Sequence, residues 1–241
     1  MKEKSIIISG QVPDNYKLKR IGDGSCGICY RTNDNMVYKE MFSTALDLYS
    51  QIKLLSQFDS SFIAFPQTIL YSDKISEENF LGYLMKYFDG LTLNKLGDKI
   101  DILKFIRHLK LLEEEVRNIS LEGITFFDLN LDNILYSEEN GIRFIDTDLY
   151  EVNLYSKDVN LQENMMELCN AIMKFLFNDY YLTFRNEKLE HLYTSCGRNG
   201  QIKPSDFLLE FIECINKSRN TNVKTLRQLR NHGFSYYLRE C

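Results

Sequence analysis

The feature that most constrains this chain is the segment FFDLNLDN at residues 126–133, which is followed by FID at residues 144–146. Asp128 and Asn133 are separated by four residues, and Asp146 comes after two short apolar runs that predict a hairpin. An aspartate, an asparagine and a second aspartate at this spacing are used to hold a nucleophile and Mg²⁺ around a triphosphate. The sequence therefore predicts a loop, a hairpin and a second loop, each loop carrying one aspartate.

A glycine-rich segment lies upstream, with Gly22, Gly24 and Gly27 in the order G-x-G-x-x-G. Glycines let the backbone approach phosphates that a Cβ would block, and leave N–H groups free to point at them. A dinucleotide-binding fold would place a helix directly after the third glycine. The alternating segment 28–31 predicts a strand instead, and Lys39 ends the next predicted strand.

Together these four signals, in this order, resemble the protein-kinase-like superfamily. Asp128 and Asn133 match H-R-D-x-x-x-x-N, Asp146 matches the aspartate of D-F-G, and Lys39 matches the lysine of V-A-I-K. The resemblance implies an α+β, two-lobed fold. We expect a small β-rich N-lobe over residues 1–88 and a larger helical C-lobe over residues 89–241.

The patterning of the chain agrees with that architecture. A helix is expected over about 43–58, with Ser43 as its N-cap. Strands are expected over 28–31, 36–39, 66–71 and 81–87, a hairpin over 133–136 and 142–145, and helices over 102–116 and 165–176.

The resemblance also implies a role for each matching residue. Asp128 would accept or orient the proton of the attacking hydroxyl, Lys39 would reach the α- and β-phosphates of ATP, and Asn133 and Asp146 would hold Mg²⁺. The remaining nucleotide contacts would come from the glycine-rich loop, the apolar positions around adenine, the gatekeeper Met85 and the hinge: Ile21, Gly22, Gly24, Ser25, Gly27, Cys29, Val37, Met85, Lys86, Tyr87, Phe88 and Leu135.

Several positions depart from the kinase pattern. Phe126 and Phe127 replace the histidine and arginine before the catalytic aspartate, and Asn130 stands where serine/threonine kinases usually carry a lysine. Asp146-Thr147-Asp148 replaces D-F-G and would give a second carboxylate on one strand face. Asp158 is the candidate anchoring aspartate of the next helix, which leaves a very short activation segment.

The glutamate that usually orients the lysine is missing. Alignment places Gln51 there, with Asp47 one turn earlier. A buried lysine without a carboxylate loses hydration, which depresses its pKa. Either Asp47 reaches Lys39 from one turn earlier, or Gln51 offers Lys39 a neutral hydrogen bond, and we favour Gln51.

Three functions follow from the resemblance. The first, which we favour, is a compact serine/threonine protein kinase that transfers the γ-phosphoryl group of ATP to a protein hydroxyl. The second is a small-molecule kinase of the aminoglycoside or choline kinase type, since those enzymes also lack a long activation segment. The third is a nucleotide-binding pseudokinase that serves as an interaction module.

Composition narrows the cellular context. A net charge of −5 argues against nucleic acid as a partner, although the stretch from Lys217 to Arg239 is basic and would suit an acidic partner. No apolar run reaches the roughly 20 residues of a membrane span, and the N-terminal apolar run is too short for a signal peptide. The six cysteines include one C-x-x-C pair, Cys26 and Cys29. A second pair, which would indicate a zinc site, is missing from the sequence. We expect a cytoplasmic protein with reduced thiols.

Overall fold

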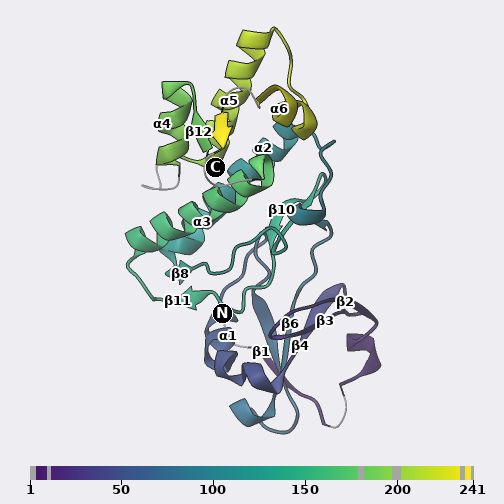
Figure 1. The fold of residues 1–241 in the computed structure, drawn as a ribbon. Coiled ribbons are helices and arrows are strands. Elements are labelled where there is room, and N and C mark those ends of the chain that lie inside the picture. The colour runs from purple at the N-terminus through teal and green to yellow at the C-terminus, as the bar shows by residue number, and fades with distance from the viewer. Residues whose placement is uncertain (1–3, 10–11, 179–181, 197–201, 234–236, 240–241) are drawn as a thin grey trace. The chain divides into compact units, whose positions relative to one another are not determined.

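The structure is a computed structural model that describes residues 4–9, 12–178, 182–196, 202–233 and 237–239. The chain is α+β, with a six-stranded sheet in its N-terminal part and helices after it (Figure 1). It divides into two compact units. The first unit is Met1–Phe88 with Phe144–Val152, and the second is Asp89–Arg143 with Asn153–Cys241.

The six-stranded sheet forms most of the first unit. Its strands are β1 (Lys4–Ile7), β2 (Lys19–Asp23), β3 (Gly27–Arg31), β4 (Met36–Met41), β5 (Pro66–Tyr71) and β6 (Phe80–Lys86). They lie in the order β1-β5-β6-β4-β3-β2, and every pair is antiparallel except β1 with β5. The strands predicted from alternation over 28–31, 36–39, 66–71 and 81–87 are confirmed to within a few residues.

The expected single helix over 43–58 is only partly correct. A 3₁₀ helix, η2 (Ser43–Leu48), precedes a short α-helix, α1 (Tyr49–Leu55). Phe42 is the N-cap residue and no side chain caps the end, so Ser43 does not have the predicted role. Ala45 has non-helical angles (φ −111°, ψ 19°), which breaks the regular α-helical hydrogen bonding. Burial of apolar side chains along α1 outweighs the cap signal that the sequence offered.

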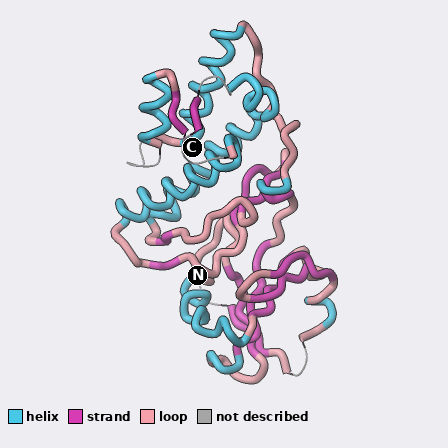
Figure 2. Tube along the Cα trace, viewed as in Figure 1, coloured by secondary structure: helices cyan, strands magenta, loops and turns pink. Residues whose placement is uncertain are grey.

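The second unit is mainly helical (Figure 2). Its helices are α2 (Ile102–Leu121), α3 (Lys157–Phe177), α4 (Glu187–Ser195), α5 (Pro204–Arg219) and α6 (Leu226–Gly233). The short strands and 3₁₀ helices elsewhere in the chain are η1 (Asp14–Tyr16), η3 (Glu77–Asn79), β7 (Leu91–Thr92), η4 (Leu93–Lys95), β8 (Ile124–Thr125), β9 (Ile134–Ser137), β10 (Gly141–Phe144), β11 (Glu151–Val152), β12 (Leu182–Phe184) and β13 (Tyr237–Arg239).

Helices α2 and α3 pack against each other and form the centre of this unit. The two helices predicted from apolar spacing are confirmed, and each is longer than expected. Asp101 caps α2, because its carboxylate accepts from the Lys104 N–H at 2.9 Å. The predicted hairpin is also confirmed as β9 and β10, which join β7 in a three-stranded sheet.

A cluster of aromatic rings holds α4, α5 and β12 together. Phe184 of β12 lies 5.1 Å from Tyr193 of α4 and 5.3 Å from Phe207 of α5, measured between ring centroids. Phe177, at the end of α3, lies 5.6 Å from Phe211. These rings pack β12, α4 and α5 against the end of α3, although the sequence of these elements matched no pattern.

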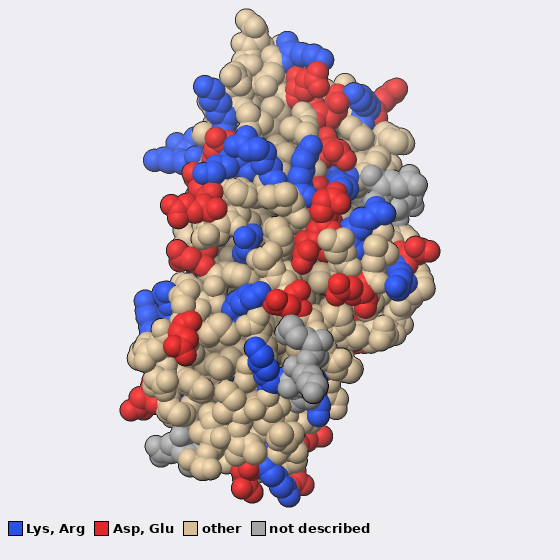
Figure 3. Space-filling model, turned by 180° about the vertical axis from the view of Figure 1, so that it is seen from behind, with Lys and Arg blue, Asp and Glu red and all other residues tan. Residues whose placement is uncertain are grey.

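Three of the basic side chains between Lys217 and Arg239 have partners within the chain. Lys217 lies 2.5 Å from Glu213, and Arg227 lies 2.9 Å from Asp98. Arg230 donates to the Leu176 carbonyl at 2.9 Å, while the Arg239 side chain and Glu240 lie outside the described residues. Acidic and basic side chains are interspersed over the face in Figure 3. None of the described helices combines the length and apolarity that crossing a membrane requires.

Candidate functional site

The glycine-rich segment forms the hairpin between β2 and β3. The Gly24 N–H donates to the Gly27 carbonyl at 3.0 Å, which closes the turn. No atom lies within 4 Å of a Cβ built on Gly22, and the nearest to one on Gly24 is Oδ2 of Asp146, at 4.0 Å. Space therefore remains beside these two glycines. A Cβ on Gly27 would instead lie 2.2 Å from the Glu40 carbonyl oxygen, so the close approach of β4 requires this glycine.

Lys39 is the middle residue of a row of three that crosses β3, β4 and β6. Cys29 pairs with Lys39, and Lys39 pairs with Tyr83, so the three side chains share one face of the sheet. Lys39 is 3% exposed. Its ammonium donates to Asp148 at 2.5 Å and also to Asp146.

Of the two carboxylates that Lys39 contacts, Asp148 is the more deeply buried. It is 1% exposed, and its second carboxylate oxygen accepts from the Tyr83 hydroxyl. Burial acts to lower the pKa of Lys39, but the attraction of Asp148 and Asp146 outweighs it and raises that pKa above its usual value. Burial first, and then the charge of Asp148, raise the pKa of Tyr83. The structure thus holds a charged lysine on two carboxylates.

This arrangement overturns the expectation for Lys39. Gln51 donates instead to the Tyr150 carbonyl at 2.6 Å, and Asp47 is exposed. Neither is bonded to Lys39, whose carboxylate partners come from the chain after β10. The prediction of a depressed lysine pKa is wrong because a carboxylate 109 residues away in sequence reaches the lysine. The sequence signal that pointed to it was the second aspartate of Asp146-Thr147-Asp148.

Asp146 and Asp148 do not share a strand face as predicted, because β10 ends at Phe144. Asp146 has φ 59°, a left-handed conformation that is uncommon outside glycine and frequent at functional sites. Backbone hydrogen bonds join Phe144 to Phe62 and to Ala64, and the Thr147 hydroxyl donates to the Ala64 carbonyl at 3.3 Å. These contacts tie the segment to the first unit.

Most residues expected around adenine pack in one apolar cluster of the first unit. Val37 and Met85 are each 4% exposed and lie in this cluster, and Cys29, Tyr87 and Phe88 pack against it. Burial, with further contributions from Asp146 and Asp148, raises the pKa of the Cys29 thiol to about 11. Cys29 therefore stays protonated and apolar at neutral pH.

Four other expected nucleotide contacts lie outside this cluster. Lys86 is engaged by Asp59 at 2.6 Å. Ile21 and Ser25 are exposed on the β2–β3 hairpin, whereas Leu135 lies on β9 in the second unit.

The loop that carries Asp128 belongs to the second unit. Asp128 is exposed and has φ 57°. The Asn133 amide donates to the Asp128 backbone carbonyl at 2.9 Å and to its carboxylate at 3.2 Å. The Asn130 amide donates to the other carboxylate oxygen at 2.9 Å. The neutral amides of Asn130 and Asn133 therefore fix the orientation of this aspartate.

Two buried asparagines of α3 support the same loop. Asn164 accepts from the Phe126 N–H at 2.6 Å and donates to the Ile124 carbonyl at 2.7 Å. Asn160 accepts from the Thr125 hydroxyl at 2.7 Å. The expected anchor, Asp158, is exposed in the first turn of α3, so that assignment is wrong. The sequence signal that was missed is the pair Asn160 and Asn164, which are four residues apart and so lie on one face of α3.

The donor set suits a hard cation only in part. Both oxygens of Asp148 are engaged, whereas the Asp146 side chain is 41% exposed. Asn133 uses its amide nitrogen on Asp128, which leaves its amide oxygen as a ligand. Within the described ranges, no group of three or more His, Cys, Asp or Glu side chains is arranged to hold a metal. Magnesium binding that depends on few protein oxygens and on substrate phosphates fits such a set.

No protein-family model matches the sequence, and no curated protein matches it either.

Proposed function

We propose that this chain is an ATP- and Mg²⁺-dependent phosphotransferase of the two-lobed protein-kinase-like fold, moving the γ-phosphoryl group to a hydroxyl. The observation that carries the proposal is the contact between Lys39 and Asp146. Sequence motifs singled out both residues independently, 107 positions apart, and the fold brings them together in one unit. Chance similarity of two short motifs would not require such a contact.

In the proposed mechanism each residue has a defined task. The Lys39 ammonium would bind phosphate oxygens, while Asp146 and the amide oxygen of Asn133 would hold Mg²⁺. The metal would supply neutralisation of the charge that develops on the phosphoryl oxygens. Asp128 would orient the acceptor hydroxyl and take its proton, and backbone N–H groups near Gly22 and Gly24 would bind phosphate.

Catalysis would then come mainly from positioning and charge stabilisation. The open space beside Gly22 and Gly24 supports the phosphate role, because a Cβ at either position would have no atom of the described residues closer than 4.0 Å. Gly27 supports the strand pairing. A protein hydroxyl and a small-molecule hydroxyl both suit this chemistry.

A nucleotide titration tests the proposal. Isothermal calorimetry with a non-hydrolysable ATP analogue should show binding that requires Mg²⁺. Lys39→Met and Asp146→Ala should each weaken it by at least about tenfold, and Glu40→Gln, next to Lys39 on β4, is the matched control. The absence of Mg²⁺-dependent binding by the unaltered protein would refute the proposal. Binding without turnover in the presence of acceptors would indicate a pseudokinase.

A further inference from the structure

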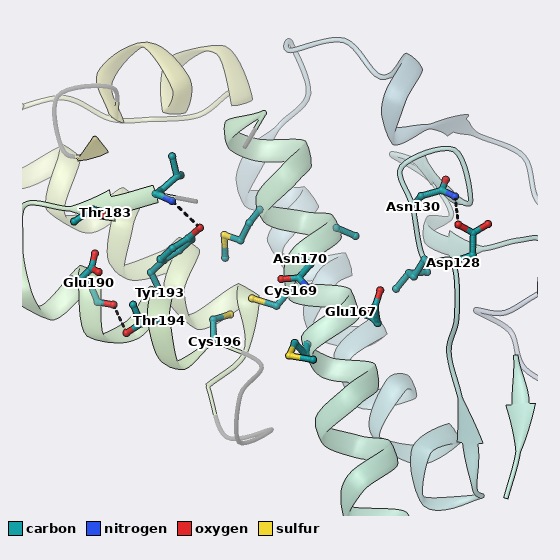
Figure 4. A pocket seen from close by; sticks show the side chains of 15 residues that line it. Asp128, Asn130, Glu167, Cys169, Asn170, Thr183, Glu190, Tyr193, Thr194 and Cys196 are labelled. Atoms are coloured by element: carbon teal, nitrogen blue, oxygen red, sulfur yellow. Dashed lines mark hydrogen bonds between the residues drawn. The ribbon is translucent and has the colours of Figure 1, made fainter. Parts of the chain in front are cut away.

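Two cysteines of the second unit face each other in the wall of a pocket. Cys169 lies in the middle of α3, and Cys196 is the C-cap residue of α4. The pocket has a volume of about 700 Å³, and both cysteines line it together with Asp128. In Figure 4 the two side chains point toward one another, from α3 on one side and from the end of α4 on the other. The fold therefore brings together two thiols from separate helices.

The two thiols also interact. The hydrogen bond with the Cys169 thiol first, and then burial, raise the pKa of the Cys196 thiol well above its usual value. The charges of Glu113 and Asp206 act in the same direction. Each of the two cysteines is 5% exposed, and both are reduced in this structure. The pair is thus a buried thiol–thiol contact with a pocket beside it.

The backbone at Cys196 suits the formation of a bond between the two sulfurs. Disulfide geometry is specific, so at least one partner must be able to adjust. Cys196 has left the helical conformation (φ −61°, ψ 123°), and its N–H donates to the Tyr193 carbonyl at 3.2 Å. A residue at the end of a helix adjusts more easily than one inside it, such as Cys169. One fixed and one adjustable partner favour closure of the bond.

A bond between these cysteines would connect two walls of the pocket. Helix α4 packs mainly on β12 and α5. The Tyr193 hydroxyl accepts from the Leu182 N–H at 3.3 Å, and the Glu190 carboxylate accepts from the Phe184 N–H at 2.5 Å, which holds α4 to β12. A bond from Cys196 to Cys169 would tie α4 directly to α3. It would therefore fix the spacing of two helices that both line the pocket.

Buried cysteines often serve only as small apolar side chains. Two observations distinguish Cys169 and Cys196 from that use: their mutual hydrogen bond, and a pocket through which a small oxidant can reach them. Other described cysteines have different neighbours. Cys26 Sγ lies 3.5 Å from the Ser25 hydroxyl, and the Cys214 thiol donates to the Glu210 carboxylate at 3.8 Å.

We propose that Cys169 and Cys196 form a reversible disulfide when the protein meets hydrogen peroxide. One thiol loses its proton and its sulfur attacks the peroxide, so an S–O bond forms, the O–O bond breaks and water leaves. The second sulfur then attacks the resulting sulfenic acid. The S–S bond forms, the S–O bond breaks and a second water leaves. Two thiols are oxidised to one disulfide, and one peroxide is reduced to two waters.

The reactive form is the thiolate, which is scarce in a buried pair at neutral pH. The pair should therefore stay reduced until peroxide accumulates, as expected of a transient disulfide in a reducing compartment. A thiol reductant would restore the two thiols by exchange. No step uses a nucleotide, so the inference is independent of the proposed phosphotransferase function.

The test uses the full chain, first reduced with dithiothreitol and then freed of it. Hydrogen peroxide is added at mildly alkaline pH, where more of each thiol is ionised. Proteolysis and mass spectrometry then identify the linked peptides. We expect one peptide pair joined through Cys169 and Cys196, lighter by two hydrogen atoms than the separate peptides and lost on addition of dithiothreitol. The cross-linked protein should melt roughly 5 °C higher than the reduced protein, because the bond constrains the unfolded chain.

Three variants locate the bond. Cys169→Ser and Cys196→Ser should each abolish the linked pair and the rise in melting temperature between the reduced and the oxidised sample. Cys214→Ser removes a half-buried cysteine of α5 that does not line the pocket, and it should leave both results unchanged. If a serine variant at the pair fails to fold, peptide mapping of the unaltered protein still decides which cysteines are joined.

Several results would overturn the inference. Recovery of Cys169 and Cys196 as thiols or as separate sulfinic acids after prolonged peroxide treatment would do so. A bond from either of them to one of the other four cysteines of the chain would do so as well. A lower melting temperature of the cross-linked protein would mean that the bond distorts the pocket wall, which contradicts the fit described above.

Discussion

The two units hold their carboxylates by different means. In the first unit, buried Asp148 is held by the Lys39 ammonium and the Tyr83 hydroxyl, so a charge balances a charge. In the second unit, the exposed Asp128 accepts side-chain hydrogen bonds from Asn130 and Asn133, which are the only donors to it among the described side chains and are neutral amides. A buried carboxylate needs a counter-charge, whereas an exposed one is stabilised by water and needs only orientation. The difference suits a permanent ion pair in one unit and the catalytic role proposed for Asp128 in the other.

The second unit also contains a buried acid without a cation in hydrogen-bond contact. Glu113 of α2 is 0% exposed and accepts from the Ser205 N–H at 2.8 Å and from its hydroxyl at 2.6 Å. Burial raises the pKa of Glu113 to about 7 despite these bonds. Asp148 has a cationic partner, whereas Glu113 is bonded to neutral donors. These neutral donors do not offset the cost of burying the Glu113 carboxylate.

The largest expected effect is on Asp128, where the difference in role is clearest. Asp128→Asn keeps the size of the side chain but removes the proton acceptor, so kcat should fall by about 10²- to 10⁴-fold. Affinity for the Mg²⁺–nucleotide complex should change by less than about threefold, whereas Asp146→Asn should weaken it strongly. Steady-state kinetics and calorimetry measure both. Undiminished turnover in Asp128→Asn would remove its catalytic role.

The next effect concerns Asp148 and stability. Asp148→Asn leaves the buried Lys39 with the partly exposed Asp146 alone, and should lower the free energy of unfolding by about 3 kcal/mol. Asp59→Asn breaks the exposed pair with Lys86 and should change stability by less than about 1 kcal/mol. Chemical denaturation compares the two variants. Equal losses would mean that the buried pair contributes no more than a surface pair.

The effect of Glu113 depends on pH. Its pKa is about 7 in the folded protein and 4.5 as the reference value, so the folded state holds a proton that the unfolded state releases. The stabilisation is complete below about pH 4.5 and is lost as pH rises to about 7, a change of up to about 3 kcal/mol. Glu113→Gln should flatten this slope in denaturation curves. Glu114→Gln, at an exposed neighbouring acid paired with Lys203, should retain it.

Loss of the Asn164 amide should have a smaller effect that combines stability and activity. Asn164→Ala leaves the Phe126 N–H without its partner, which costs about 1–3 kcal/mol of stability. Turnover should fall as well, because the Asp128 loop loses its support on α3. Asn118→Ala, at an exposed position of α2, is the control and should be neutral in thermal melts and assays. An unchanged rate in Asn164→Ala would limit its role to stability.

Removal of phosphate groups from the protein is expected to have no effect on its activity. Both carboxylate arrangements are held by contacts internal to their own unit, and Phe127 stands where an arginine would pair with a phosphate. Protein treated with phosphatase should therefore keep its full initial rate. A lag that prior autophosphorylation abolishes would contradict this.

Local structure followed closely from the sequence. The alternating strands around 28–39, the hairpin after Asn133 and the helices predicted over 102–116 and 165–176 have strong periodic signals, and each forms. Ser43 misled because a cap signal is weak beside the burial of α1. The last quarter of the chain gave no pattern, since its packing depends on rings from separate elements such as Phe184 and Phe207.

The candidate site also has features that the sequence predicted and features that only the structure revealed. The sequence by itself identified the residues on which the proposed function rests, because the glycine spacing, Lys39, Asp128 and Asp146 are local motifs. Only the tertiary structure decided which partners they have: Asp148 and not Gln51 for Lys39, and Asn164 and not Asp158 beneath the Asp128 loop. The physical reason is that burial and long-range contact set the energy of a charge, and neither is encoded in neighbouring residues.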